Sequence, residues 1–162
     1  MPPPPTPAPS PDRPAQRHRT VVARHTLPDG SWHLDWMIDR VGGREAAGDG
    51  EADHRDLVTF RVMVRPDDPV ARVFDGERIP DHRAAYLTRE GDIGEGRGSV
   101  ARVAGGWCTI DRLDGDALDL TFDLGRGPRR VSGRRTGRAM KPDDRPGAFE
   151  DWRFAVREAP GR

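Results

Sequence analysis

A histidine and an aspartate two positions apart are the residues of this chain best placed to do chemistry. His33 and Asp35 lie in the stretch from Trp32 to Asp39, where large apolar residues alternate with more polar ones. Side chains two apart on a strand share a face, so the imidazole and the carboxylate would project together. Such a pair can hold a metal ion or contact a phosphate. A half-buried strand with a solvated outer face explains the same pattern.

Two further histidines can join this pair. His25 ends a short apolar segment, and the turn sequence Pro28-Asp29-Gly30 separates it from His33. That turn predicts a hairpin that brings His25 close to His33 and Asp35. His82 lies in a later segment that also carries Tyr86. We therefore ask which fold could position these groups together.

Composition limits the class of protein. With 162 residues, 34% of them hydrophobic, and a mean hydropathy of −0.80, the chain suits one domain with a modest core. Basic and acidic residues both number 27, so net charge does not attract the chain to nucleic acid. A lone Cys108 excludes an internal disulfide and a cysteine-based zinc finger. Without an apolar membrane-spanning segment or a secretory signal, we expect a cytoplasmic protein.

Short β-prone runs separated by Gly, Pro and Asp turns dominate the chain, and helical periodicity is scarce. This pattern predicts a mainly β protein, a compact antiparallel β-barrel with short helical pieces. The apolar face of Trp32, Leu34, Trp36 and Ile38 should face the core. Further strands are expected at Arg19 to Arg24, Leu57 to Val64, Ala71 to Phe74, Ser99 to Val103, Trp107 to Ile110, Ala117 to Leu124, Arg129 to Ser132 and Trp152 to Val156.

Segments of low complexity set the domain boundaries and loops. Residues 1–18 are Pro-rich and predict a disordered tail, residues 19–157 form the domain, and residues 158–162 form a short C-terminal tail. Residues 41–53 predict a loop. Residues 90–98 hold four glycines and predict a hairpin connection with positive φ angles. A phosphate-cradling loop is the alternative, although the spacing matches neither the Walker A nor the dinucleotide motif.

One strongly basic segment bears on the substrate. The chain from Arg126 to Lys141 carries seven basic residues and no acidic one, including the adjacent Arg134 and Arg135. Such a segment can contact a phosphate backbone despite the zero net charge. A solvated hairpin balanced by the acidic run from Asp111 to Asp123 is the structural alternative.

Several short motifs follow one another in a distinctive order: His25, then His33-Leu34-Asp35-Trp36, then Asp81-His82-Arg83-Ala84-Ala85-Tyr86, then Glu90-Gly91, then Ser99-Val100. This ordered set resembles the N-terminal 3′-phosphoesterase domain of bacterial DNA ligase D, of which small stand-alone versions exist. The similarity runs from about Arg24 to Arg157 and rests on the order of the motifs rather than on any single one. It implies a β-barrel with a metal site in a cleft, and manganese-dependent removal of 3′-terminal ribonucleotides and 3′-phosphates.

The resemblance also implies roles for individual residues. His25, Asp35 and His82 would be the metal ligands, His33 would contact the scissile phosphate, and Tyr86 matches a tyrosine of the family's site. Two imidazoles and one carboxylate leave coordination positions open. This mixed nitrogen and oxygen set suits Mn²⁺, or another divalent transition metal such as Zn²⁺, better than Ca²⁺.

This chain departs from the family at the phosphate clamp. The family carries an arginine two residues after the aspartate, where this chain has Met37. Arg65, Arg72 and Arg78 are the candidates for the remaining phosphate contacts. Three interpretations stay open: a metal-dependent phosphoesterase in DNA repair, a catalytically weakened homologue that binds DNA ends or a repair protein, and an unrelated small barrel with structural histidines.

The partners implied by the resemblance are DNA or RNA–DNA 3′ ends. An end-joining ligase or a Ku-like repair protein would be the protein partner. We expect a monomer that contacts no membrane.

Overall fold

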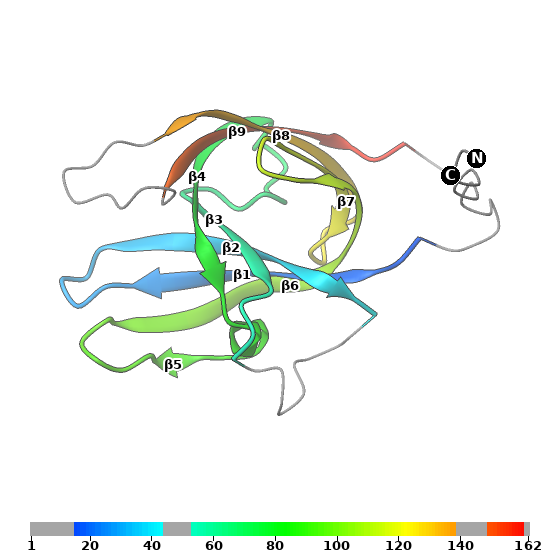
Figure 1. The fold of residues 1–162 in the computed structure, drawn as a ribbon. Coiled ribbons are helices and arrows are strands. Elements are labelled where there is room, and N and C mark those ends of the chain that lie inside the picture. Colours follow the sequence, from blue (N-terminus) through cyan, green and yellow to red (C-terminus); the bar gives the residue numbers. More distant parts are fainter. Residues whose placement is uncertain (1–14, 44–52, 139–148, 161–162) are drawn as a thin grey trace, which may run out of the picture.

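A single antiparallel sheet of nine strands makes up almost all of the regular structure in the computed structural model (Figure 1). The structure describes residues 15–43, 53–138 and 149–160. The one helix within these residues is a short 3₁₀ turn, η1 (Ala84–Leu87). The strands are β1 (His18–Thr26), β2 (Trp32–Gly42), β3 (Leu57–Val62), β4 (Val73–His82), β5 (Gly91–Asp92), β6 (Ser99–Leu113), β7 (Ala117–Asp123), β8 (Arg129–Arg138) and β9 (Glu150–Glu158).

The sheet closes into a ring. Its strand order is β1-β2-β3-β4-β9-β8-β7-β6-β5, and an additional antiparallel pairing joins β1 to β6 (Figure 1). The β1–β6 pairing removes the open edge that β1 would otherwise present at one end of this order. The predicted mainly β, antiparallel fold with short helical pieces is confirmed. No described helix is long and apolar enough to cross a membrane.

Two strands are longer than their sequences predict. β6 runs without interruption from Ser99 to Leu113, although two separate strands were expected there. It pairs with β1 over its first part and with β7 from Trp107 onward. The pairing of Gly105 and Gly106 with β1 keeps the strand continuous despite the low strand propensity of glycine. β4 also continues through Pro80, where a register shift in the β3–β4 pairing accommodates the proline.

The chain ends add contacts to the sheet. β1 already begins at His18, and Arg17 lies over the Trp107 ring at 4.7 Å, so the predicted tail boundary is slightly late. Most of the residues assigned to the N-terminal tail and to the 41–53 loop lie outside the described residues.

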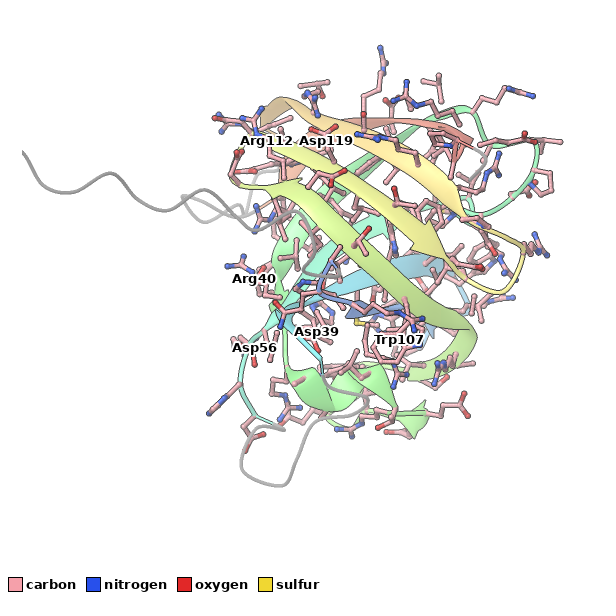
Figure 2. All side chains as sticks on the ribbon, turned by 90° about the vertical axis from the view of Figure 1, so that its right-hand side faces the viewer. Asp39, Arg40, Asp56, Trp107, Arg112 and Asp119 are labelled. Atoms are coloured by element: carbon pink, nitrogen blue, oxygen red, sulfur yellow. The ribbon has the colours of Figure 1, made fainter. Side chains whose placement is uncertain are left out.

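At the end of β2, the N–H of Arg40 donates to the carbonyl of Asp56 at 3.0 Å, and Figure 2 shows this end of the ring.

The ring encloses an aromatic core. Trp36 is fully buried among Phe60, Phe122 and Phe154, with ring centroids 6.1, 5.7 and 5.6 Å away. Leu34 and Ile38 share this core, as the alternation predicts. The assignment of Trp32 to the core is wrong. Its side chain is 39% exposed because it lies at the start of β2, where Arg24 covers the ring at 4.4 Å.

A second, smaller cluster covers the opposite face of β2. Met37 is 1% exposed and packs in this cluster, which η1 closes through Leu87 and the partly buried Tyr86. The face that carries His33 and Asp35 is therefore buried rather than solvated. The other members of the cluster are Val21, Ala23 and Leu57.

Candidate metal centre

The β1–β2 hairpin places the first three residues of the site. His25 pairs directly with His33 across the two strands, and their rings meet edge to face with centroids 4.9 Å apart. Asp35 follows on the same face of β2, opposite Ala23. His82 comes from the end of β4, two strands away in the sheet. The turn and the strand alternation predicted the hairpin correctly, whereas the approach of β4 is a tertiary effect.

The Asp35 carboxylate lies at the centre of three imidazoles. Its Oδ2 atom is 3.9 Å from Nδ1 of His25 and 3.8 Å from Nε2 of His82. Its Oδ1 atom is 3.2 Å from Nε2 of His33. Donor atoms of His25, His33 and Asp35 all lie within 4.8 Å of one another. The structure thus brings together all four residues that the sequence proposed for the metal and the phosphate.

Backbone carbonyls orient two of the histidines. Nε2 of His25 lies 2.7 Å from the carbonyl oxygen of Arg97, and Nδ1 of His82 lies 2.9 Å from that of Pro80. A carbonyl oxygen only accepts hydrogen bonds, so these ring nitrogens carry the proton. In the neutral rings, Nδ1 of His25 and Nε2 of His82 then present lone pairs toward Asp35. Ligating histidines in metal sites are commonly held by such a second hydrogen bond.

Two buried polar atoms in the site have no hydrogen-bond partner. Nε2 of His33 and Oδ1 of Asp35 both lack one among the described residues, although they are close together, because the angle between the groups is unsuitable. Ligand atoms around a transition metal are about 3.0–3.5 Å apart, given bonds of about 2.0–2.2 Å. The gaps of 3.8 and 3.9 Å between Asp35 and the two imidazoles exceed this range by a few tenths of an ångström. The compact group of His25, His33 and Asp35 could hold a metal ion, and the identity of the metal stays a prediction.

Arginines that sequence reasoning missed adjoin the site. A cavity of about 370 Å³ is lined by His82 and Tyr86 together with Arg55, Arg83 and Arg97. Arg83 directly follows His82 in the sequence, which is a signal that could have identified it. Arg97 comes from the predicted glycine-rich turn, whose glycines do adopt positive φ angles, and nothing in the sequence links Arg55 to this site.

Tyr86 lies beside the histidines rather than among them. It belongs to η1, and its ring meets the His82 ring edge to face at 5.4 Å. Arg83 and Arg89 lie 5.9 and 5.7 Å from its centroid. The tyrosine therefore lines the cavity next to a proposed ligand, and its catalytic role stays a prediction.

The other predicted phosphate-binding arginines lie in other surroundings. Arg65 forms two hydrogen bonds with the buried Asp67, at 2.9 and 2.8 Å, and this pairing raises the pKa of the guanidinium above its usual value. Arg72 is exposed before β4. Nη2 of Arg78 lies 3.6 Å from Oδ1 of Asp81. Their roles in phosphate binding stay predictions.

Arg134 and Arg135 lie on β8, which pairs with β7 and β9 rather than with the strands of the site. Arg134 pairs with Asp119 at 3.2 Å and Arg135 with Asp116 at 2.6 Å. The structure does not bring these two arginines to the histidines. Part of the basic segment beyond them lies outside the described residues.

Comparison with known proteins assigns no relative to this site. No protein-family model matches the chain, and no curated protein matches it. Its chemistry is therefore interpreted from its own geometry.

Proposed function

We propose that this chain is a metal-dependent phosphoesterase that removes a 3′-phosphate or a 3′-ribonucleotide from nucleic-acid ends in DNA repair. One observation carries the proposal. The buried Asp35 carboxylate faces His25 and His82, and backbone carbonyls orient both rings so that their free nitrogens point toward it. This arrangement suits a divalent metal such as Mn²⁺ or Zn²⁺.

The two oxygens of Asp35 suggest a division of roles. Oδ2, between His25 and His82, would join these rings in holding the metal. A metal bound there would supply Lewis-acid polarisation of a phosphoryl oxygen. The Nε2 atom of His33 lies 3.2 Å from the other oxygen, Oδ1, which leaves His33 outside the pair of rings that face Oδ2. From there His33 would stabilise negative charge on the phosphate or donate a proton to the leaving oxygen.

The adjoining cavity supports a phosphate-containing substrate. Arg55, Arg83 and Arg97 line it next to His82. Guanidinium groups match the geometry and charge of phosphate oxygens. These arginines supply positive charge next to the site, whereas Met37, at the position where the resemblance implies an arginine, is neutral. The ordered motifs that resemble the ligase D phosphoesterase domain point to the same substrate class.

A second candidate is a module that binds DNA ends or a repair protein without catalysis. The burial of Met37 favours it, because the resemblance implies an arginine at this position. Removing one charged donor from a reacting centre can cost roughly 2–4 kcal/mol of transition-state stabilisation. Binding through the cavity arginines would persist without that donor.

Phosphate release from a primer with a 3′-phosphate tests the proposal. Wild-type protein should release phosphate with Mn²⁺ and lose this activity in a chelator. Asp35→Asn should lower the rate of phosphate release at least about 100-fold, because it removes the negative charge that the Asp35 carboxylate would contribute to metal binding. His54→Gln is the matched control, since His54 is exposed and lies outside the site. If the wild type binds the primer but releases no phosphate with Mn²⁺ or Zn²⁺, the second candidate is correct.

A further inference from the structure

The cavity beside the candidate metal centre is lined entirely by cationic and neutral side chains. Its volume is about 370 Å³, and no carboxylate contributes to its lining in the part of the chain that the structure describes. Three arginines line it from segments far apart in the sequence: Arg55 before β3, Arg83 before η1, and Arg97 in the β5–β6 turn. A cavity with this charge selects an anion.

The three guanidinium groups have only weak acidic partners. Arg55 donates to the backbone carbonyl of Asp81 at 3.2 Å and forms no ion pair with the residues that the structure describes. Arg83 lies 3.3 Å from Asp53 and Arg97 lies 3.8 Å from Glu95, but these carboxylates are 88% and 84% exposed. Ion pairs with such exposed groups are screened by solvent and contribute little. A bound phosphate can therefore replace them readily.

Two residues join the cavity to the metal centre. His82 lines the cavity, and its Nε2 is also 3.8 Å from Oδ2 of Asp35. Arg97 lines the cavity, and its carbonyl oxygen lies 2.7 Å from Nε2 of His25. An anion in the cavity thus lies directly beside the groups that would hold the metal.

We propose that this cavity is a second phosphate subsite that binds a backbone phosphate of a single-stranded nucleic acid, apart from the reacting 3′ end. The identity of the ligand rests on the proposed function. Tyr86 also lines the cavity, so its side chain would lie beside the nucleotide that carries this phosphate. The subsite would make the chain prefer polynucleotide ends to small phosphate esters.

Binding of a fluorescent single-stranded DNA oligonucleotide with a 3′-hydroxyl end, which the proposed activity leaves unchanged, tests the subsite when it is measured by anisotropy with Mn²⁺ present. The triple variant Arg55→Gln, Arg83→Gln, Arg97→Gln should bind at least about tenfold more weakly. The slope of log affinity against log salt should fall by about 0.7, the contribution of one phosphate on a single strand. A Mn²⁺-induced rise in Tm like that of the wild type would show that the triple variant folds with its metal centre intact.

Arg112→Gln is the matched control. Arg112 lies on β6 (Figure 2). It pairs with Asp114 at 2.7 Å and lines a different cavity. The affinity of the Arg112→Gln variant for the oligonucleotide, and its salt slope, should equal those of the wild type. Arg55→Gln alone should weaken binding in the same direction, which provides a second measurement if the triple variant does not fold.

Two results would overturn the subsite. The first is equal affinity and equal salt slope in the wild type and the arginine variants, even if the wild type releases phosphate. The second is displacement of the fluorescent oligonucleotide by inorganic phosphate at the same concentration at which unlabelled oligonucleotide displaces it. That result would assign the cavity to free phosphate. A wild type that binds through these arginines but releases no phosphate would instead contradict the proposed function alone.

Discussion

Nε2 of His33 lies 3.2 Å from Oδ1 of Asp35, yet neither atom has a hydrogen-bond partner among the described residues. The two residues are 6% and 3% exposed, so water has little access to either. A buried polar atom without a partner costs roughly 1–3 kcal/mol. The pair is therefore more consistent with a site that binds a further species than with one that only stabilises the fold.

The first prediction separates the role of His33 from that of His82. Mn²⁺ at about 100 times its Kd should stabilise the wild type by about 2.7 kcal/mol. His82→Ala should abolish this increment, because His82 faces the same carboxylate oxygen as His25. His33→Ala should keep the increment but lose phosphate release. Thermal unfolding with and without Mn²⁺ measures the increment, and the primer assay measures phosphate release.

His54→Gln, in an exposed residue, is the control for replacing a histidine and should behave like the wild type. The reverse outcome, with the increment lost in His33→Ala and kept in His82→Ala, would show that the ligands are His25, His33 and Asp35. That set is also compact enough to hold an ion.

Local signals made half of the site predictable from sequence. The Pro28-Asp29-Gly30 turn indicated a hairpin, and alternation placed His33 and Asp35 on one face. The structure has the hairpin and pairs His25 with His33. Closure of the sheet, by contrast, depends on β1 pairing with β6, and no local pattern encodes a contact between segments so distant in the chain.

The rest of the site depends on contacts that sequence periodicity does not report. The carbonyl of Arg97 orients His25 from a turn far along the chain. Alternation also predicted that the face of β2 carrying Met37 could be solvated, whereas η1 buries it with Leu87 and Tyr86. Trp32 shows the converse error, because an apolar residue at a strand end can extend past the core.

The second prediction concerns Met37, at the position where the resemblance to the ligase D phosphoesterase domain implies an arginine. Met37→Arg should lower the free energy of unfolding by at least about 2 kcal/mol, because the guanidinium would be buried in an apolar cluster. Met37→Leu keeps the volume and should cost less than about 1.5 kcal/mol. Urea denaturation measures the free energy of unfolding of both variants. An unchanged midpoint in Met37→Arg, together with faster phosphate release, would mean that the new side chain reaches the metal centre instead.

The third prediction is a pH dependence from Cys108. Burial, and then the nearby Asp39 charge, raises the pKa of the thiol to about 12. The unfolded thiol has a pKa of about 8.5, so the folded state binds more protons between about pH 9 and pH 12. The stabilisation is fully present below this window and is lost as pH rises through it, by up to about 1.4 kcal/mol per pH unit.

Cys108→Ala tests this dependence, because it removes the titrating group from a site that is 2% exposed. The free energy of unfolding should fall less steeply in this variant than in the wild type between about pH 9 and pH 11. Parallel curves for the two proteins would show that the thiol does not titrate differently in the folded state.

The last prediction tests whether the turn that carries Arg97 orients His25. Gly98 has a φ of +94°, and a Cβ atom there would collide with the backbone oxygen of Thr26. Gly98→Ala should therefore displace the neighbouring Arg97 carbonyl from Nε2 of His25. Loss of an outer hydrogen bond of this kind typically weakens metal binding 10–100-fold. Titration of Mn²⁺ by calorimetry measures the change.

Gly96→Ala is the matched control within the same turn. Its φ is +66°, but no atom lies within 4 Å of the Cβ position, so the substitution adds strain without a collision. It should cost about 1 kcal/mol of stability and leave the Mn²⁺ affinity unchanged. If Gly98→Ala folds and binds Mn²⁺ as tightly as Gly96→Ala, the carbonyl of Arg97 is not what positions His25 for the metal.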